Sequence, residues 1–294
     1  MYVEQLPSAE LSSHIECFWS KQISPTCHTP AIQPPQGTFE LIFTKEALVF
    51  SAFNGQAFIN QILPPGVWLI GQQTRCFFWQ CDKKTEVWGA RIKPFALFSC
   101  LNASPNELKN KVVELKELTR SPCANSSKLL EYLFDRHVEE RLYFKTRLML
   151  LERFIRDLFM DDFQVAKRVR SISNMIMRQR GNLKLADLCQ QFEVSKVTLR
   201  NHFLSTIGIL PKELSKLWRL NYCLLLQYQY PHYSLTDIGL LSGYYDQAHL
   251  IKEFKSVFPL TPSQLIKRDS LLEIDSVHQI NRRLNAGYVP RTAS

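Results

Sequence analysis

The chain has 294 residues, of which 45% are hydrophobic and 21% charged, with a formal net charge of +9. This length predicts two domains, and the composition is that of an ordinary soluble globular protein. No apolar run approaches the ~20 residues of a membrane-spanning helix. The N-terminal segment MYVEQLPSAE lacks the basic and apolar regions of a signal peptide, so we expect a cytoplasmic protein with no membrane partner.

The positive charge belongs to one part of the chain. Residues 163–294 contain 18 Lys and Arg against 9 Asp and Glu, whereas residues 1–162 contain 18 of each kind. Because a polyanion releases counterions when basic side chains neutralise its phosphates, this excess predicts nucleic acid as the partner of the C-terminal half. The alternative is a solvated basic surface with no partner.

Residues 1–100 have the features of a β-rich domain. They are rich in aromatic and β-branched residues and are interrupted by turn signals, among which Asn54-Gly55 tolerates the positive φ of a tight hairpin. The segment Glu10–Ser20 could be a short helix or a further strand. We therefore expect a small β-barrel or sandwich. Its expected strands are Phe39–Thr44, Leu48–Phe53, Val67–Gly71, Phe77–Cys81 and Val87–Lys93.

Large aromatic residues concentrate in the same region. A small β-domain can line an apolar ligand cavity with such residues. Aromatic residues are also the ordinary filling of a small barrel, and we favour a filled core over a pocket. The candidate ligand-binding residues are Trp68, Phe78, Trp79 and Trp88.

Residues 101–162 have the features of a helical connector. The stretch from Ser104 to Glu107 has the spacing of a capping box, with Pro105 at the first helical position, so it predicts a helix that begins there. A second helix is expected at Arg141–Met160, where apolar residues recur at helical spacing. This helix could mediate dimerisation or pack onto its own domain.

One pattern occurs twice near the C-terminus. Its first copy spans Leu185–Leu214 and its second copy Leu235–Leu265. An extra residue in the second copy falls between two helices, where a turn can absorb it. At an offset of 50, Leu185, Asp187 and Leu188 match Leu235, Asp237 and Ile238; at an offset of 51, Leu199, Phe203, Pro211 and Leu214 match Leu250, Phe254, Pro262 and Leu265.

Each copy has the layout of a helix-turn-helix. A short helix and a tight turn, which contains Gly243 in the second copy, precede a second helix that begins at Ser195 or Asp246; both are good N-caps. In each second helix two apolar residues lie four positions apart and form one buried face. The opposite faces carry Lys196, Arg200 and Asn201 in the first copy, and Gln247, His249, Lys252 and Lys255 in the second.

These two copies resemble the C-terminal DNA-binding domain of AraC-type transcription regulators, which has two helix-turn-helix units joined by a long helix. Here that helix would be Pro211–Tyr228, and Val165–Arg180 would be the first helix of the domain. Pro259 stands where the family has glycine, and Gly239 where it usually has alanine. The family's second unit typically carries the residues found here as Ile238, Gly243, Tyr244, Asp246, Leu250, Phe254, Lys255, Thr261 and Pro262.

The resemblance implies two recognition helices that enter successive major grooves, one helical turn or ~34 Å apart. Arginine prefers guanine, and Asn and Gln prefer adenine. Ser195, as a helix N-cap, and His249, as a donor, also belong to the expected DNA-binding surface. Phosphate contacts are expected from Lys196, Lys216, Arg219 and Lys255, and base contacts from Val197, Arg200 and Asn201 in the first unit and Gln247, Ala248 and Lys252 in the second.

The N-terminal half resembles, more weakly, a domain that precedes the DNA-binding domain in one subgroup of AraC-type regulators. This resemblance implies ligand sensing or dimerisation. The matching pieces are Leu11–Trp19, Pro35–Phe43, Gly71–Arg75 and Trp88–Pro94.

Nothing in the sequence indicates catalysis. The common hydrolase, nucleotide-binding and zinc-protease motifs are absent, and the eight cysteines form no CxxC pair. Cys76 and Cys81 could pair across a hairpin, and His14 and Cys17 could meet Cys27-His28 in a metal site, but such residues are more often structural. A DNA-modifying enzyme would need a reactive cysteine of low pKa. We therefore expect no cofactor, no metal and no enzymatic activity.

The predicted fold class is α+β: a β-rich N-terminal barrel or sandwich, then helices, then an all-α domain with two helix-turn-helix units joined by a long helix. The expected divisions are 1–100, 101–162, 163–268 and a tail at 269–294 that packs as a short helix and then frays. The expected partners are double-stranded DNA, RNA polymerase and a small-molecule effector. Two alternatives stay open: a homodimer, and a regulator without effector whose N-terminal domain serves only in assembly.

Overall fold

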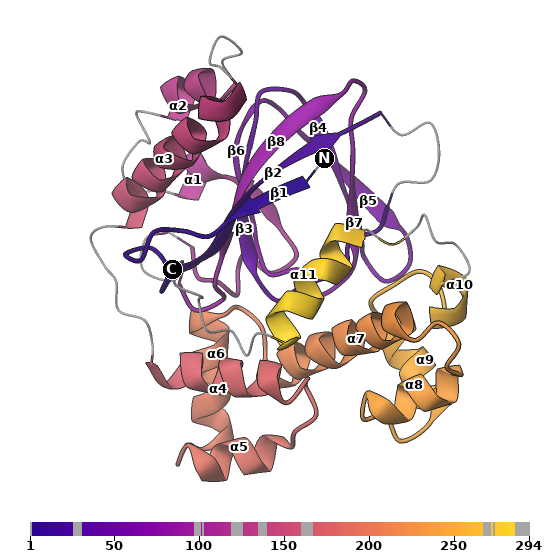
Figure 1. Ribbon diagram of the computed structural model, residues 1–294. Helices are drawn as coiled ribbons and strands as arrows, with labels where there is room; N and C mark the ends of the chain where they lie inside the picture. Colours follow the sequence, from indigo (N-terminus) through magenta and orange to yellow (C-terminus); the bar gives the residue numbers. More distant parts are fainter. Residues whose placement is uncertain are drawn as a thin grey trace.

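The computed structural model describes residues 2–25, 31–96, 101, 103–118, 126–134, 140–159, 167–266, 272 and 274–285. The fold is the expected α+β arrangement, with a β-rich N-terminal domain, a group of helices beside it and a helical C-terminal domain below it (Figure 1). Among the described residues, no helix has the length and apolar character needed to cross a membrane.

Two antiparallel sheets, together termed the barrel, form the N-terminal domain. They pack face to face, and the strand order of each shows which strands are neighbours. The larger sheet has the order β1 (Tyr2–Gln5), β2 (Ile15–Ile23), β8 (Thr85–Ile92), β3 (Phe39–Thr44), β6 (Gly66–Ile70), β9 (Val112–Glu114), and the smaller has the order β5 (Phe58–Leu63), β4 (Leu48–Phe53), β7 (Phe77–Gln80).

The larger sheet has a core on each face. Because successive side chains of a strand point to opposite faces, Leu41 and Phe43 of β3 lie on the helix side while Ile42 lies between the two sheets. The helices on the outer face include α3, whose Phe154 meets Phe43 edge to face with ring centroids 5.6 Å apart. These helices are α1 (Leu115–Leu118), α2 (Ser126–Leu133) and α3 (Glu140–Phe159).

Most strand predictions are confirmed. The bounds of β3 and β4 are those expected, and β6, β7 and β8 differ from expectation by one or two residues. The segment around residues 10–20 is a strand from Ile15 onward, and Gly55 has φ 107° in the predicted hairpin turn. The sequence did not indicate β1, β5 or β9.

The predicted helix at Ser104 does not form. The capping contact exists, since the Ser104 N–H donates to Glu107 Oε2 at 2.8 Å, but residues 105–110 form successive turns. Asn110 has φ 56°, and its N–H donates to the Gln72 carbonyl oxygen at 2.9 Å. Tertiary contacts with the barrel therefore override the local helix signal.

The helix at α3 packs on its own domain. Leu151, Phe154 and Ile155 are buried in the core on the outer face of the large sheet. This observation favours the packing alternative over dimerisation for these residues. The side chains at 141–144 and 159–160 lie outside the described part, as do Cys27 and His28 of the metal alternative. Cys76 and Cys81 are both free thiols.

The C-terminal domain is built around α7, a 19-residue helix (Figure 1). Twelve residues of this helix are buried, and they fall on all of its sides. One helix-turn-helix unit lies at each end of α7, and a last helix packs along it. The helices are α4 (Lys167–Arg178), α5 (Leu185–Gln191), α6 (Lys196–Thr206), α7 (Pro211–Gln229), α8 (Leu235–Leu241), α9 (Gln247–Lys255), α10 (Pro262–Ile266) and α11 (Ile274–Asn285).

The barrel contacts both helix-turn-helix units. At the first unit, Gly208 lies against the carbonyl of Pro105, in the turns that precede β9. At the second, the Cys76 N–H donates to the Val257 carbonyl oxygen at 3.0 Å, and Phe53 shares a core with Phe254 and other residues of that unit. Between them, Asn221 Nδ2 of α7 donates to the Pro35 carbonyl at 3.0 Å. The barrel therefore bridges the two units.

We predict that Gly71→Ala destabilises the fold. A Cβ atom at Gly71 would lie 1.8 Å from the Leu108 carbonyl oxygen, so the backbone would have to move. Such a change is expected to lower the free energy of unfolding by ~1–3 kcal/mol in chemical denaturation. Gly239→Ala in α8 is the control, because its Cβ would meet Leu250 at an ordinary 3.5 Å. Alanine should stabilise the helix there by up to ~1 kcal/mol. Equal losses from both variants would contradict this explanation.

Candidate nucleic-acid interface and barrel cavity

The second helix of the first unit, α6, is fixed by a cap and a buried stripe. Ser195 Oγ accepts a hydrogen bond from the Thr198 N–H at 3.0 Å, which satisfies one free donor of the first turn. Leu199 and Phe203 are buried against the first unit's core. This anchoring leaves the opposite face of α6 to solvent, and its exposed residues include Ser195, Lys196, Val197, Arg200 and Asn201.

The second unit repeats this construction in α9. Asp246 Oδ1 accepts from the His249 N–H at 2.7 Å, and Leu250 and Phe254 are fully buried. His249 also lies beside Glu253, with 3.4 Å between Nε2 and Oε1. The exposed face of α9 carries all five residues predicted there: Gln247, Ala248, His249, Lys252 and Lys255.

The turns of the two units differ in detail. The second turn has Gly243 with φ 82°, as the sequence predicts, whereas the first has Glu193 with φ 50°. A non-glycine residue in this region is uncommon and carries some strain. Pro259 replaces the glycine that the first unit has at Gly208, where φ is 89°. Because proline fixes φ near −65°, the chain after α9 must take a different path from the chain after α6.

Two predicted phosphate-binding residues lie between helices. Lys216 Nζ of α7 donates to Ser256 Oγ after α9, and burial lowers the pKa of its ammonium. Arg219 Nη2 lies 3.3 Å from Glu253 Oε2, and its guanidinium is 4.9 Å from the centre of the Tyr244 ring. Both side chains therefore tie α9 to α7, and any phosphate contact would compete with these bonds.

Sequence reasoning missed one exposed aromatic residue at this surface. Tyr245 is 90% exposed and directly precedes the N-cap of α9. The available signal was its position between the buried Tyr244 and Asp246, where the turn must point one side chain outward.

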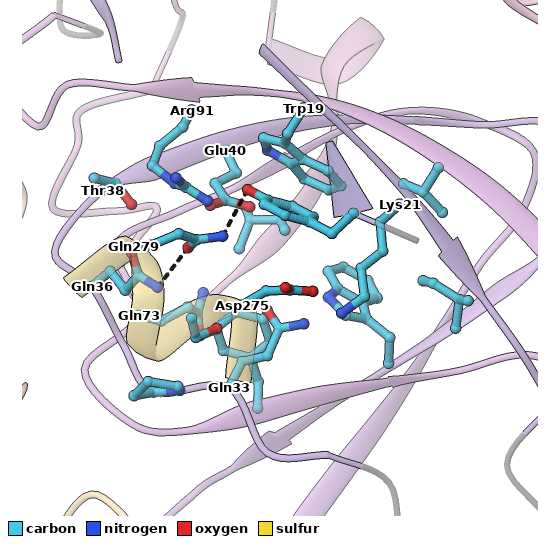
Figure 2. Close-up of a pocket in the computed structure, with 18 residues that line it drawn as sticks. Trp19, Lys21, Gln33, Gln36, Thr38, Glu40, Gln73, Arg91, Asp275 and Gln279 are labelled. Atoms are coloured by element: carbon cyan, nitrogen blue, oxygen red, sulfur yellow. Dashed lines mark hydrogen bonds and ion pairs between the residues drawn. The ribbon is translucent and has the colours of Figure 1, made fainter. Parts of the chain in front are cut away.

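A small cavity opens at one end of the space between the two sheets (Figure 2). Its volume is about 50 Å³, and its apolar wall includes Trp19 of β2 and Phe77 and Trp79 of β7. Its polar wall includes Arg91 of β8, Gln36 and the side chain of Gln279 from α11. The cavity thus lies where the barrel meets the last helix.

The four candidate ligand-binding aromatic residues do not gather around this cavity. Trp79 alone lines it. Phe78 directly precedes Trp79 in β7, so its side chain points to the opposite face of the sheet. There it packs against Phe58, with ring centroids 4.7 Å apart. Trp68 Nε1 donates to the Pro64 carbonyl at 3.0 Å, and Trp88 lies in the core on the helix side of the large sheet.

Two known families match parts of the chain. The family described as "Helix-turn-helix domain" matches residues 188–268, and the one described as "Domain of unknown function (DUF6597)" matches residues 3–114. No curated protein matches the chain.

Several solved structures of ToxT from Vibrio cholerae are similar in fold. An apo form from strain SCE256 has a TM-score of 0.47 and 15% identity, and covers 85% of this chain and 97% of that one. A 1.65 Å structure has a TM-score of 0.47 and 13% identity, with 85% and 98% covered. A third, bound to (E)-4-(8-methylnaphthalen-1-yl)but-3-enoic acid, has a TM-score of 0.46 and 13% identity, with 85% and 98% covered.

We predict that Asp246→Ala weakens α9. The substitution removes the oxygen that caps the His249 N–H, and the loss of such a cap costs ~1 kcal/mol, a fall of a few degrees in Tm. Asp246→Asn keeps an acceptor oxygen at the same place and serves as the matched control. Thermal unfolding followed by circular dichroism tests both. An Asn variant as unstable as the Ala variant would show that charge, not capping, is what Asp246 supplies.

Proposed function

We infer that the chain is a sequence-specific regulator whose α6 and α9 read successive major grooves of one duplex. The premise is the AraC-type helix-turn-helix domain at the C-terminus, which implies DNA-binding transcription regulation. The observation that supports this most strongly is the matched construction of the two helices. Each has a capped N-terminus, a buried apolar stripe and an exposed polar face, and both pack on the same buried α7.

The exposed side chains suit direct readout of bases. Arg200 can make two bonds to guanine, while Asn201 and Gln247 suit adenine. Val197, 68% exposed, and Ala248 can touch thymine methyl groups. Lys196 and Lys255 lie at the ends of these faces and would hold phosphates.

The barrel is proposed to sense an effector. The supporting feature is the cavity, which lies next to α11 and thus close to the DNA-binding domain. RNA polymerase would be the further partner of such a regulator. The alternative is a barrel that only assembles with another protein or a second copy. In its favour, β5 lies at the edge of the smaller sheet and exposes Ile59 and Ile62.

Selection of bound DNA from a random pool, at two salt concentrations, tests the proposed function. We expect an enriched motif with two parts one helical turn apart, since both recognition helices pack on α7. Binding that falls steeply with salt but enriches no motif would reject specific regulation and leave a general affinity for polyanions.

We predict that Arg200→Ala relaxes base preference at one position. Loss of a bidentate base contact costs ~1–3 kcal/mol at that base pair and little elsewhere. Competition binding with a set of single-base variants of the selected site measures this. Lys212→Ala, an exposed lysine at the start of α7 and outside both recognition helices, is the matched control. A uniform loss on every sequence would show that Arg200 holds a phosphate instead.

A further inference from the structure

Helix α11 lies outside the residues matched by either family, yet it contacts both domains. It follows the residues matched by the helix-turn-helix family. Val277 and Ile280 are fully buried, and they form a small core with Leu225 of α7. The opposite side of α11 faces the mouth of the barrel (Figures 1 and 2). This helix therefore joins the cavity to the element that carries both helix-turn-helix units.

Gln279 of α11 places its carboxamide in the cavity (Figure 2). Its Nε2 donates to Tyr2 Oη at 2.7 Å, and its Oε1 accepts from Gln36 Nε2 at 2.8 Å. The barrel thus presents a donor and an acceptor that match the two ends of an amide group. Gln279 is 5% exposed, so these bonds form away from bulk water.

The same helix completes a buried cluster of charges. Arg91 is 3% exposed, and its guanidinium pairs with Glu40 at 2.9 Å and Glu4 at 3.1 Å. Glu16 lies 3.7 Å from it as a third carboxylate. Burial alone would raise the pKa of Glu4, but the charge of Arg91 and a hydrogen bond from Tyr2 hold it below its ordinary value.

Two arginines of α11 pair with carboxylates of the same cluster. Arg282 pairs with Glu4, and Arg283 Nε lies 3.3 Å from Glu16 Oε2. Lys93 lies near Glu16 as well and contributes to the balance. Since a buried charge without a partner is costly, α11 is held at the barrel mouth by charge as well as by Gln279.

The cavity is too small for a ring while Gln279 occupies it. Its volume of about 50 Å³ falls well short of the ~150 Å³ cavity that holds benzene. Within the described part of the chain, the buried Trp19 Nε1 on its wall has no hydrogen-bond partner. Withdrawal of the Gln279 side chain would enlarge the space and leave an aromatic wall beside an amide-binding pair.

We propose that the mouth of the barrel binds a small neutral molecule with a carboxamide on a flat apolar body, and that Gln279 of α11 holds this site when the molecule is absent. This step rests on the regulator function proposed above and adds the chemical class of its effector. Ligand and Gln279 use the same Gln36 and Tyr2 groups, so binding breaks two of the bonds that hold α11 and favours its release from the barrel. Because α11 also packs on α7, occupancy of the barrel reaches the DNA-binding domain through it.

Benzamide binding to the full-length protein tests the site. Gln279→Ala removes the resident amide and should tighten benzamide about tenfold or more, because a site that no longer has to be vacated binds with its full affinity. Gln36→Leu or Tyr2→Phe in the Gln279→Ala background removes one half of the amide-binding pair and should reverse this gain. Gln22→Ala, an exposed amide on β2 outside the mouth, is the matched control and should change nothing. Titration calorimetry provides the affinities.

Tryptic cleavage after Arg282 and Arg283 reports the release of α11. We expect benzamide to accelerate cleavage at these bonds, and benzoate, which cannot donate to Tyr2 Oη, to leave it unchanged. Absence of saturable benzamide binding by the Gln279→Ala protein would overturn the proposal. So would tighter binding of benzoate than of benzamide, which would make the mouth an anion site.

Specific DNA binding by the unliganded protein tests the regulator function separately. Specific DNA binding without any benzamide effect would overturn the ligand site alone. Benzamide binding with cleavage, in a protein that selects no DNA motif, would overturn the regulator function and retain the site.

Discussion

The structure depends on the burial of α7 on all of its sides. Leu217 belongs to the core of the first helix-turn-helix unit, Leu224 to that of the second, and Leu225 to the small core beneath α11. Asn221, between them, bonds to the barrel. A surface helix buries one stripe, whereas the buried residues of α7 meet neighbours on several sides. The positions of α6 and α9 relative to each other, and of both relative to the barrel, are therefore determined by one shared helix.

Local sequence patterns predicted the strands and helices whose burial follows one repeating pattern. The strands β3 and β4 alternate between two cores, and their bounds follow from the alternation. The exposed faces of α6 and α9 follow from the spacing of Leu199 and Phe203, and of Leu250 and Phe254, because a helix fixed by one buried stripe leaves a definite opposite face. The N-caps Ser195 and Asp246 followed from their chemistry in the same way.

The elements and contacts that the sequence failed to predict share a physical cause: they depend on residues that are distant in the sequence. The exposed β5 has polar residues on both faces and pairs with β4 alone. The capping box at Ser104 makes its bond but opens no helix, because Gln72 and the DNA-binding domain hold the following turns. Lys216 and Arg219 look like free basic residues on a helix, and only the position of α9 shows that they face Ser256 and Glu253. Which aromatic residue lines the cavity likewise depended on how two sheets stack.

The bridge between the barrel and both helix-turn-helix units has a consequence for the evolution of the DNA sites that such a protein reads. Each base pair turns the duplex by about 34–36°. A protein with a loose linker between its two reading helices could follow an inserted or deleted base pair by flexing. Here Gly208 at one unit and Val257 at the other are both held against the same barrel. Substitution of single base pairs in a binding site would therefore weaken binding by degrees. Insertion or deletion of a base pair between its two parts would nearly abolish binding.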